Sequence, residues 1–356
     1  MRAPALGASA AREAWLRPDG WATIGASRER GAISGTPGDT TTYRSRIMDF
    51  VLGIDGGATT TKAVVLDASG AVVGTGEADG CNPLVCGFEA AGKQLVEAAR
   101  VAAEAADMGL AYFASACYGL AGVGRAHDLK RMTDLLGQQG LAAVFEVDHD
   151  AAVALYGATA GEPGVITIAG TGAIAFGIDA DGKRARADGW GRLMGDEGGG
   201  YDLALRTLRA AARSVEGRGP QTELPDRIRQ TTGTADLDQL ATWLYSSYRS
   251  PAEIASLARC ALEAAEAGDS VALALVEESA GRLAETTLSV VRQLWPSPVR
   301  VTVSYGGTLL VRKGPLQRLF CDAVRERIPQ IGVQPPLHTA AHGAALRALA
   351  KLRDPG

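Results

Sequence analysis

The chain has 356 residues, enough for two domains of about 150 residues each. Hydrophobic residues make up 46% of the chain and charged residues 21%, which excludes global disorder and permits a sizeable core. Basic residues number 36 and acidic residues 40, so the formal net charge is 36 − 40 = −4, which argues against nucleic acid or an anionic membrane as the main partner.

The first 49 residues differ in composition from the rest of the chain. Arg, Gly, Ser and Thr are frequent there, and apolar residues show little periodicity. We expect residues 1–49 to form a disordered N-terminal extension. A transit peptide is the weaker interpretation, because acidic residues interrupt the basic ones. The folded pattern begins directly after Met48, which is an alternative natural start.

From residue 50 the chain alternates between strands and helices. Short apolar runs bounded by turn residues predict strands, and Ala, Val and Leu at helical spacing predict helices. The expected strands cover residues 50–55, 63–67, 71–77, 111–120 and 143–148. The expected helices cover residues 88–107, 126–137 and 151–160.

The opening pattern then returns. Strands expected at 164–169 and 173–179 flank the turn Gly170-Thr171-Gly172. The Asp-Ala-x-Gly hairpin that starts at Asp179 repeats the one that starts at Asp67, an offset of 179 − 67 = 112 residues. A repeat of this length indicates a duplicated domain, because the units of solenoids have about 20–50 residues.

The second half is predicted to be mostly helical. A strand at 299–305 leads into Gly306-Gly307 and a further helix, and Asp269 is expected to cap the helix that follows it. The expected helices cover residues 200–214, 236–247, 252–267, 271–294 and 340–351.

The five cysteines are scattered and include no Cys-x-x-Cys pair. This pattern argues against a disulfide framework or a structural zinc site and favours a reducing compartment. No apolar run approaches the roughly 18 residues of a membrane helix, and the first residues lack the apolar stretch of a secretory signal. We therefore expect a cytoplasmic protein with no membrane partner.

Glycine-rich turns between strands are the first candidate for chemistry. Such turns expose several backbone N–H groups and can form concavities that bind anions. The hydroxyls of Thr59, Thr60 and Thr171 add further donors. Either turn alone is explained by an ordinary hairpin, but two turns at matched places, with Gly306-Gly307 after a later strand, favour a polyphosphate site.

Three runs of residues resemble the sugar-kinase/actin/heat-shock-chaperone ATPase superfamily. Residues 53–62 (GIDGGATTTK) resemble its first phosphate loop, residues 169–173 (AGTGA) its second phosphate loop, and residues 303–307 (VSYGG) its adenosine loop. Residues 189–198 (GWGRLMGDEG) resemble a segment of the N-acetylglucosamine kinases of the BadF/BadG-type ATPase family. Gly119-Leu120-Ala121-Gly122 and Asp150-Ala151-Ala152 also match, so the resemblance covers about residues 50–350.

This resemblance implies an α/β fold, the two-lobed actin-like ATPase (ribonuclease H-like) fold with duplicated domains and a nucleotide cleft between the lobes. The N-terminal lobe would comprise residues 50–163 plus 340–352, and the C-terminal lobe residues 164–339. The two Gly turns would then grip one nucleotide from two sides.

The resemblance also implies an ATP site with Mg²⁺. Asp55 would hold hydrated Mg²⁺, which binds one or two carboxylates together with phosphate oxygens; an ordinary turn Asp is the alternative. The implied ATP-binding residues are Gly56, Gly57, Thr59, Thr60, Gly170, Thr171, Gly172, Ala255, Gly306 and Gly307.

Asp150 is the residue at which the resemblance places the catalytic base. Phosphoryl transfer to an alcohol needs a carboxylate that accepts the hydroxyl proton and orients the oxygen. A helix N-terminus would keep this carboxylate ionised. The alternative is a plain helix N-cap. His149 is expected to be a structural residue rather than a base.

The sugar site would take residues from two segments. Asn82 would bind sugar hydroxyls, although Asn-Pro is also a turn signal, and Trp190 would lie against the sugar ring, although a core Trp is the alternative. The implied substrate-binding residues are Asn82, Asp150, Ala173, Ile174, Gly189, Trp190, Gly191 and Asp196. Leu84 and Ala173 depart from many relatives, which carry an aromatic residue and Ser there, so the identity of the sugar stays open.

The implied reaction is transfer of the γ-phosphoryl group of ATP to the 6-hydroxyl of an amino sugar, with N-acetylglucosamine as the first choice. Glucosamine, glucose and an N-acetylmuramic derivative stay open as substrates. The partner would be a small-molecule sugar, without nucleic acid, and a homodimer is compatible with the resemblance. The rival hypotheses are an iron–sulfur ATPase activator of a radical dehydratase or reductase, and a sugar sensor without turnover.

Overall fold

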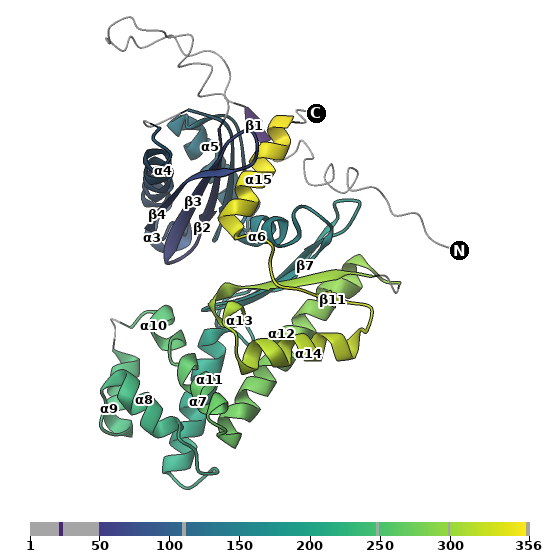
Figure 1. The fold of residues 1–356 in the computed structure, drawn as a ribbon. Helices are drawn as coiled ribbons and strands as arrows, with labels where there is room; N and C mark the ends of the chain where they lie inside the picture. The colour runs from purple at the N-terminus through teal and green to yellow at the C-terminus, as the bar shows by residue number, and fades with distance from the viewer. Residues whose placement is uncertain (1–20, 24–49, 109–111, 247–248, 298–299, 354–356) are drawn as a thin grey trace, which may run out of the picture. The chain divides into compact units, whose positions relative to one another are not determined.

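The computed structural model describes residues 21–23, 50–108, 112–246, 249–297 and 300–353. These residues form two compact units (Figure 1). Unit 1 comprises the chain up to Glu162, the short segment Ala180–Gly182 and the chain from Pro336 onward, and unit 2 comprises Pro163–Asp179 and Lys183–Pro335. Within the expected N-terminal extension, Trp21–Thr23 forms a short strand, and the other residues up to 49 lie outside the described part.

Unit 1 is a six-stranded sheet covered by helices on both faces. The strand order is β1-β6-β5-β2-β3-β4. The elements are β1 (Trp21–Thr23), β2 (Val51–Gly56), β3 (Thr60–Leu66), β4 (Val72–Asp79), α3 (Pro83–Cys86), α4 (Phe88–Ala105), β5 (Phe113–Leu120), α5 (Ala126–Gln139), β6 (Ala142–His149), α6 (Asp150–Thr159) and α15 (Ala340–Arg353).

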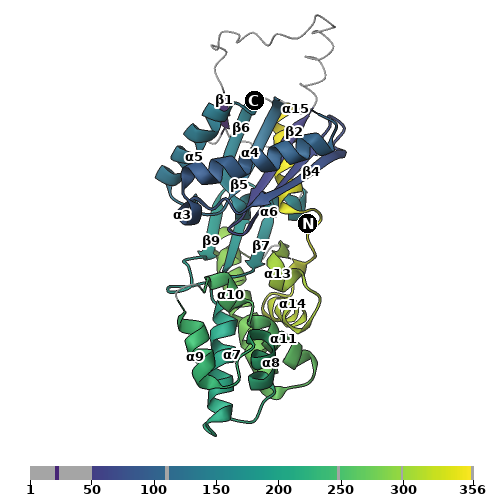
Figure 2. The same ribbon diagram turned by 90° about the vertical axis from the view of Figure 1, so that its left-hand side faces the viewer.

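The small residues of unit 1 decide how its layers pack. Helices α4 and α15 cover opposite faces of the sheet (Figures 1 and 2). A Cβ on Gly53 of β2 would lie 2.6 Å from the Cα of Ala345 in α15, so the helix rests directly on the strand backbone. Gly76 of β4 lies equally close to the backbone of α4 near Ala102. Alanine and glycine therefore bring both helices within backbone contact of the sheet.

Unit 2 combines a five-stranded sheet with a larger set of helices. The strand order is β11-β10-β7-β8-β9. The elements are β7 (Gly164–Ala169), β8 (Ala173–Ile178), β9 (Arg184–Asp188), α7 (Gly200–Val215), α8 (Leu224–Thr232), α9 (Leu237–Tyr245), α10 (Pro251–Ala255), α11 (Ala258–Glu266), α12 (Ser270–Leu294), β10 (Thr302–Gly306), α13 (Gly307–Val311), α14 (Pro315–Arg327) and β11 (Gly332–Val333).

The two sheets repeat one topology. In unit 1, β2, β3 and β4 form an antiparallel meander, and β2 pairs with the parallel strand β5. In unit 2, β7, β8 and β9 form the same meander, and β7 pairs with the parallel strand β10. The duplication expected from the sequence repeat is therefore confirmed, because the same strands occupy the same places in both sheets.

Several elements differ from the sequence prediction. The single helix expected over 252–267 is two helices, α10 and α11, which meet at Ser256 and Leu257. Ser250 caps α10 in a capping box with Glu253, so the chain starts a short helix before it turns into α11. The sequence prediction also missed β9, α8 and α14, whereas the cap of α12 is confirmed because Asp269 Oδ1 accepts a hydrogen bond of 2.8 Å from the Ala272 N–H.

Candidate functional site

The functional residues of unit 1 gather at one edge of its sheet. Strands β2, β5 and β6 run parallel, and Asp55 pairs with Gly119, which in turn pairs with Asp148. The carboxyl ends of the three strands therefore lie side by side. This register places Asp55, at the end of β2, near Asp150, which follows β6 as the first residue of α6.

The Asp55 carboxyl lies in an environment that disfavours its charge. Burial raises its pKa to about 7, the Asp150 carboxyl adds to the rise, and the Lys62 ammonium opposes it. Lys62 itself lies on the surface in an ion pair with Glu77, with 3.6 Å between Nζ and Oε1. A partly buried carboxyl held in this way gains stability from a cation that replaces the lost hydration.

Asp150 is the first residue of α6 rather than its N-cap, which is His149. Its Oδ1 accepts a hydrogen bond of 2.8 Å from the Ala151 N–H. Burial raises the pKa of the Asp150 carboxyl, and the Ala151 N–H and the His149 side chain oppose this rise. Burial is therefore the largest effect on the pKa of this carboxyl, and the hydrogen bond at the start of α6 opposes it.

The first Gly turn packs against two loops of unit 1. The Gly57 N–H donates to the Thr60 carbonyl at 3.0 Å and closes the turn, and the Cys81 N–H donates to the Gly57 carbonyl at 3.0 Å. The Ala121 N–H donates to the Gly56 carbonyl at 2.8 Å. The turn thus stands beside Asn82 and the loop after β5, and Thr59 at its tip is exposed.

Asn82 has the local turn role considered from the sequence. Its Oδ1 accepts a hydrogen bond of 3.0 Å from the Leu84 N–H, so it is the N-cap of α3. The side chain also lies against Gly122, where a Cβ would come within 2.8 Å of the Asn82 Cγ. The cap fixes the side chain at the edge of the sheet that carries Asp55.

The second Gly turn, in unit 2, is joined to the start of α7. The Gly200 N–H donates to the Gly170 carbonyl at 2.8 Å, and the Tyr201 N–H donates to the Thr171 carbonyl at 2.9 Å. Gly199 lies so close to this turn that a Cβ on it would stand 2.7 Å from the carbonyl carbon of Gly172. Only glycine at 199 permits this approach, which brings residues 30 positions apart into one site.

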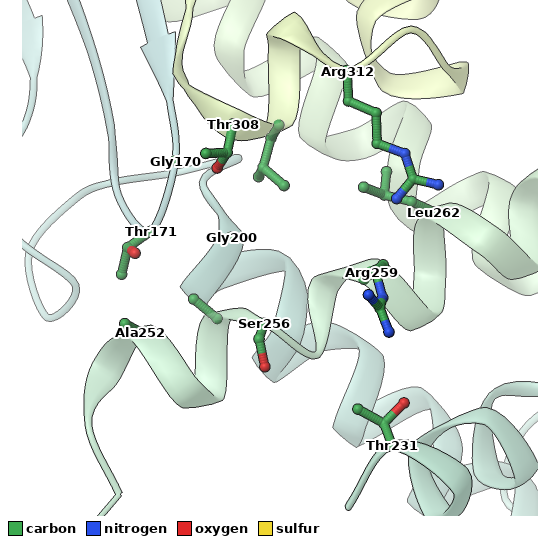
Figure 3. Close-up of a pocket in the computed structure, with 12 residues that line it drawn as sticks. Gly170, Thr171, Gly200, Thr231, Ala252, Ser256, Arg259, Leu262, Thr308 and Arg312 are labelled. Atoms are coloured by element: carbon green, nitrogen blue, oxygen red, sulfur yellow. The ribbon is translucent and has the colours of Figure 1, made fainter. Parts of the chain in front are cut away.

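A cavity of about 450 Å³ opens from this turn in unit 2 (Figure 3). Figure 3 places Thr171 toward one end and Leu262 and Arg312 toward the other. The lining residues are Gly170, Thr171, Gly200, Thr231, Ala252, Ala255, Ser256, Arg259, Leu262, Thr308, Leu309 and Arg312. A volume of this size suits a nucleoside-sized ligand.

The lining includes Gly170, Thr171 and Ala255 from the predicted nucleotide residues. Gly306 and Gly307 are not among the lining residues. They are the N-cap and the first residue of α13, and the next residue, Thr308, lines the cavity. Gly307 has φ 79° and leaves no room for a Cβ beside Ala169 at the end of β7. Gly56, Gly57, Thr59 and Thr60 belong to unit 1, and Gly172 contacts the neighbouring loop instead of the cavity.

Sequence reasoning missed the two arginines of the cavity. Arg259 of α11 pairs with Glu263 at 3.2 Å, and Arg312, the C-cap of α13, pairs with Glu266 at 3.7 Å. No motif marked either residue, because α11 was expected to be part of one long helix over 252–267 and α13 had no assigned bounds. Their appearance in one cavity depends on the break between α10 and α11.

The loop from Gly189 to Gly199 leaves its aromatic residue exposed. Trp190 is 61% exposed, which excludes the alternative of a core residue. The Arg186 guanidinium stacks over the Trp190 ring at 4.3 Å from its centroid. Gly189, with φ 72°, packs against Ile174 of β8, and this turn projects the Trp190 ring outward.

Asp196 links this loop to the second Gly turn. Its Oδ1 accepts a hydrogen bond of 3.3 Å from the Gly191 N–H, and its own N–H donates to Asp188 Oδ1 at 2.7 Å. Burial raises the pKa of the Asp196 carboxyl, an effect that the Gly191 and Ala173 N–H groups oppose. Unit 2 therefore brings Ala173, Asp196 and the loop around Trp190 together, as expected.

The described residues could bind magnesium, but they do not form a cluster of several protein ligands for it. Among the residues that the structure describes, no three His, Cys, Asp or Glu side chains cluster as ligands of a metal. Mg²⁺ usually keeps several waters and binds one or two carboxylates with substrate phosphates. The single partly buried Asp55 at the first Gly turn fits that mode of binding.

Comparison with known proteins adds two relatives with assigned activities. The chain is 31% identical over 232 residues to the N-acetylmuramic acid/N-acetylglucosamine kinase of Clostridium acetobutylicum, covering 65% of this chain and 76% of that protein. It is 31% identical over 242 residues to the N-acetyl-D-glucosamine kinase of Dictyostelium discoideum, covering 66% and 75% respectively.

Solved structures share the fold at lower identity. A candidate N-acetylglucosamine kinase from Chromobacterium violaceum matches with a TM-score of 0.68 and 23% identity, over 85% of this chain and 99% of that chain. A ROK family glucokinase from Streptomyces griseus matches with a TM-score of 0.54 and 17% identity, over 84% and 98%. These matches confirm the actin-like ATPase fold expected from the sequence.

The family assignment rests on the same stretch of chain as the fold. The loops with Asp55, Thr171 and Trp190 and the start of α6 all lie inside residues 52–348. Over these residues the chain matches the model of the BadF/BadG/BcrA/BcrD ATPase family, and it belongs to that family.

Proposed function

We propose that this chain is an ATP-dependent kinase that phosphorylates the 6-hydroxyl of an amino sugar. Among the amino sugars, we propose N-acetylglucosamine as the substrate. The observation that carries the proposal is the buried carboxyl of Asp150 at the carboxyl edge of the unit 1 sheet, beside Asp55. The activities assigned to both relatives, each 31% identical, support the same substrate class.

The nucleotide would occupy the cavity of unit 2. The phosphates would bind the turn from Gly170 to Gly172, where backbone N–H groups and the Thr171 hydroxyl are donors. The nucleoside would lie along Ala255, which is small and leaves space beside Gly200. The turn of unit 1 with Gly56, Gly57, Thr59 and Thr60 would supply further donors to the phosphates, and α13 behind Gly306 and Gly307 would close the nucleoside end.

Asp55 would hold a hydrated Mg²⁺ ion. When bound, the ion neutralises charge on the transferring phosphoryl group. Burial disfavours the charged form of the Asp55 carboxyl, and a bound cation would offset this effect. The Asp55 environment thus favours binding of metal together with the nucleotide over binding of metal alone.

Asp150 would accept the proton of the sugar 6-hydroxyl while the oxygen attacks phosphorus. A general base works best when its pKa lies nearer the working pH, and burial shifts the pKa of Asp150 in that direction. The hydrogen bond from the Ala151 N–H holds one oxygen of the carboxyl and leaves the other for the substrate.

Each unit offers residues for the sugar. In unit 1, Asn82 lies at the same edge as Asp150. In unit 2, Gly189 packs against Ile174 next to the exposed Trp190, and the Asp196 carboxyl accepts from the Gly191 N–H near Ala173. An exposed indole ring offers an apolar face to a sugar ring, while the Asp196 carboxyl accepts hydrogen bonds from hydroxyl or amide groups.

A panel of sugars measured for sugar-dependent ADP release tests the proposal. The panel contains N-acetylglucosamine, glucosamine, glucose and N-acetylmuramic acid, each with ATP and Mg²⁺. We expect turnover with N-acetylglucosamine and phosphate on its 6-oxygen. Failure of every hexose and amino sugar would rule the kinase out, and a brown, oxygen-sensitive preparation would favour an iron–sulfur activator.

The compartment is proposed on cysteine chemistry. The five cysteines are free thiols in this fold, and a reducing compartment such as the cytoplasm would keep them so. Within the described ranges, no helix has the length and apolar character needed to cross a bilayer. Labelling of the thiols in freshly lysed cells, before and after reduction, would check their oxidation state.

A further inference from the structure

A buried ion cluster lies behind the proposed catalytic residue. The guanidinium of Arg347, in α15, is 1% exposed. Its Nη1 donates to Asp148 Oδ2 at 2.7 Å, and its Nη2 donates to Glu146 Oε1. Glu146 and Asp148 both belong to β6 and are separated from Arg347 by about 200 residues of sequence. None of the three residues carried a motif in the sequence.

Stability alone is a weak reason to keep such a cluster. Burial removes the hydration of all three charges, and apolar residues of similar size often stabilise a protein as well or better. Buried ion pairs are best understood where they also fix a specific geometry. The geometry at stake here is the passage from β6 into α6.

Asp148 connects the cluster to that passage. Its Oδ2 binds Arg347, and its Oδ1 accepts a hydrogen bond of 2.8 Å from the backbone N–H of His149. His149 is the N-cap of α6, and the next residue is Asp150. One carboxylate therefore binds both Arg347 and the backbone N–H of the residue that precedes the proposed base.

The position of Arg347 is itself fixed by close packing of α15. A Cβ on Gly343 would lie 2.6 Å from the Cα of Gly157 in α6, and Gly53 of β2 approaches α15 equally closely at Ala345. Helix α15 thus rests on β2, which carries Asp55, and on α6, which begins with Asp150. A shift of the guanidinium would require the helix to leave both contacts.

We propose that Arg347 is a positioning residue, which acts through the Asp148 carboxylate to hold the turn that presents Asp150. This inference rests on the proposed function, in which Asp150 accepts the proton of the sugar hydroxyl. Arg347 and Asp148 orient the turn and do not touch the substrate.

Turnover of matched variants tests the proposal. Arg347→Met removes the guanidinium that binds Asp148, and Asp148→Ala removes the carboxylate that binds the His149 N–H. For each variant we expect kcat to fall at least tenfold, while KM for sugar and for ATP changes less than threefold. Arg347→Lys should recover part of the loss. The control is Glu146→Gln, which removes a buried charge from the same guanidinium four residues before Asp150 and keeps an acceptor; we expect kcat within threefold of the wild type.

A double variant separates positioning from general loss of structure. If Arg347 acts through Asp150, adding Arg347→Met to Asp150→Asn lowers kcat no further than Asp150→Asn alone. A further tenfold loss, or an equal loss in Glu146→Gln, would overturn the proposal. A drop in kcat that only follows the folded fraction, measured by circular dichroism, would overturn it as well.

Hydrogen exchange provides a readout that does not depend on activity. We expect the amides of residues 149–152 to exchange at least tenfold faster in Asp148→Ala than in the wild type, with the core of β5 unchanged. Unchanged exchange at these amides contradicts the positioning role. A wild-type chain without sugar-dependent turnover would refute the proposed function, while the exchange result would still decide whether the cluster holds the turn.

Discussion

Asp150 illustrates how burial and local structure compete at a single residue. The carboxyl stands at the first position of a helix, where the helix dipole and the Ala151 N–H favour its charged form. Burial acts in the opposite direction and has the larger effect on its pKa. The net result is a pKa raised above the ordinary value of a carboxyl.

The role of Asp150 can be tested without disturbing the helix. Asp150→Asn keeps the side-chain oxygen that accepts the Ala151 N–H but cannot take up a proton. We expect kcat to fall about 10²–10⁴-fold, the usual contribution of a general base, with an unfolding temperature no lower than that of the wild type, because burial disfavours the charge that the substitution removes. Steady-state kinetics and thermal denaturation check this, and retained turnover would remove Asp150 from the mechanism.

Asp55 makes the stability of the metal-free protein depend on pH. Its pKa is 3.8 in the ordinary state and about 7 in the fold, so the folded protein takes up a proton that the unfolded chain releases. Stability from this group is present below about pH 4 and is lost as the pH rises toward 7. The Asp55→Asn variant does not lose this stability as the pH rises, because the amide of Asn is uncharged in both the folded and the unfolded state.

We therefore expect Asp55→Asn to be more stable than the wild type at pH 8, by about 3–5 kcal/mol at roughly 1.4 kcal/mol per unit of pKa shift. Near pH 4 the two proteins should be equal. Urea denaturation in the presence of a chelator measures both differences. A variant that is less stable at pH 8 would show that Asp55 does not bury an unfavourable charge.

Ala255 allows the nucleotide cavity to be tested by filling it. Ala255→Phe would place a ring where the cavity now extends beside Gly200. We expect KM for ATP to rise at least tenfold, about 1.4 kcal/mol in binding, with KM for the sugar unchanged. Ala241→Phe on the exposed side of α9 is the control and should leave both values unchanged. Equal effects of the two substitutions would place the nucleotide elsewhere.

At the scale of elements, α15 matters most in unit 1. The helix comes from the end of the chain but packs on β2, β3, β5 and α6. Its contact with β2 depends on Gly53, where a side chain would overlap the helix backbone at Ala341 and Ala345. Backbone on both sides leaves no flexible group that could move aside.

Gly53→Ala should therefore cost more than an ordinary small-to-large change, about 3 kcal/mol or more. Gly281→Ala is the matched control, because Gly281 lies inside α12 and its Cβ would meet nothing within 4 Å. In this helix Ala should stabilise by about 0.5–1 kcal/mol. Denaturant titration of the two variants measures the change in the free energy of unfolding for each. If Gly53→Ala leaves this free energy unchanged, the observed packing is contradicted.

At the scale of the whole molecule, the two units differ in how the chain builds them. Unit 2 has one large apolar core made by residues between Val165 and Ile331. Unit 1 has two apolar clusters, and the smaller one joins β2, β3 and α6 to α15. The first unit is therefore complete only when the last helix of the chain returns to it.

A chain that ends at Pro335 tests this difference. Without α15, the apolar residues of β2 and β3 that now pack on it, Val51, Val64 and Leu66 among them, would be exposed to water. We expect the amides of β2 and β5 to lose protection from hydrogen exchange, while those of β7 and α12 keep theirs. Equal loss in both units would show that they fold as one cooperative body.

Much of the fold could be predicted from local patterns. The bounds of β2, β5, β6 and β7 lie within two residues of the predicted ones, because strand signals need only neighbouring residues. The strand β9 escaped prediction, since its sequence Arg184–Asp188 is polar and its pairing with β8 decides its structure. The break between α10 and α11 escaped for a similar reason, because Ala-rich sequence continues through it.

The sequence by itself determined the duplicated fold and the positions of its Gly turns. Strands and turns depend on neighbouring residues, and the repeat is visible in the sequence as the same motif at two positions. It also singled out Asp55, Asp150 and the loop around Trp190 through their motifs. Only the tertiary structure decided what surrounds them. Burial of Asp150, the cavity with Arg259 and Arg312, and the cluster of Arg347 with Asp148 arise from contacts between distant segments, and no local pattern encodes which distant side chains will meet.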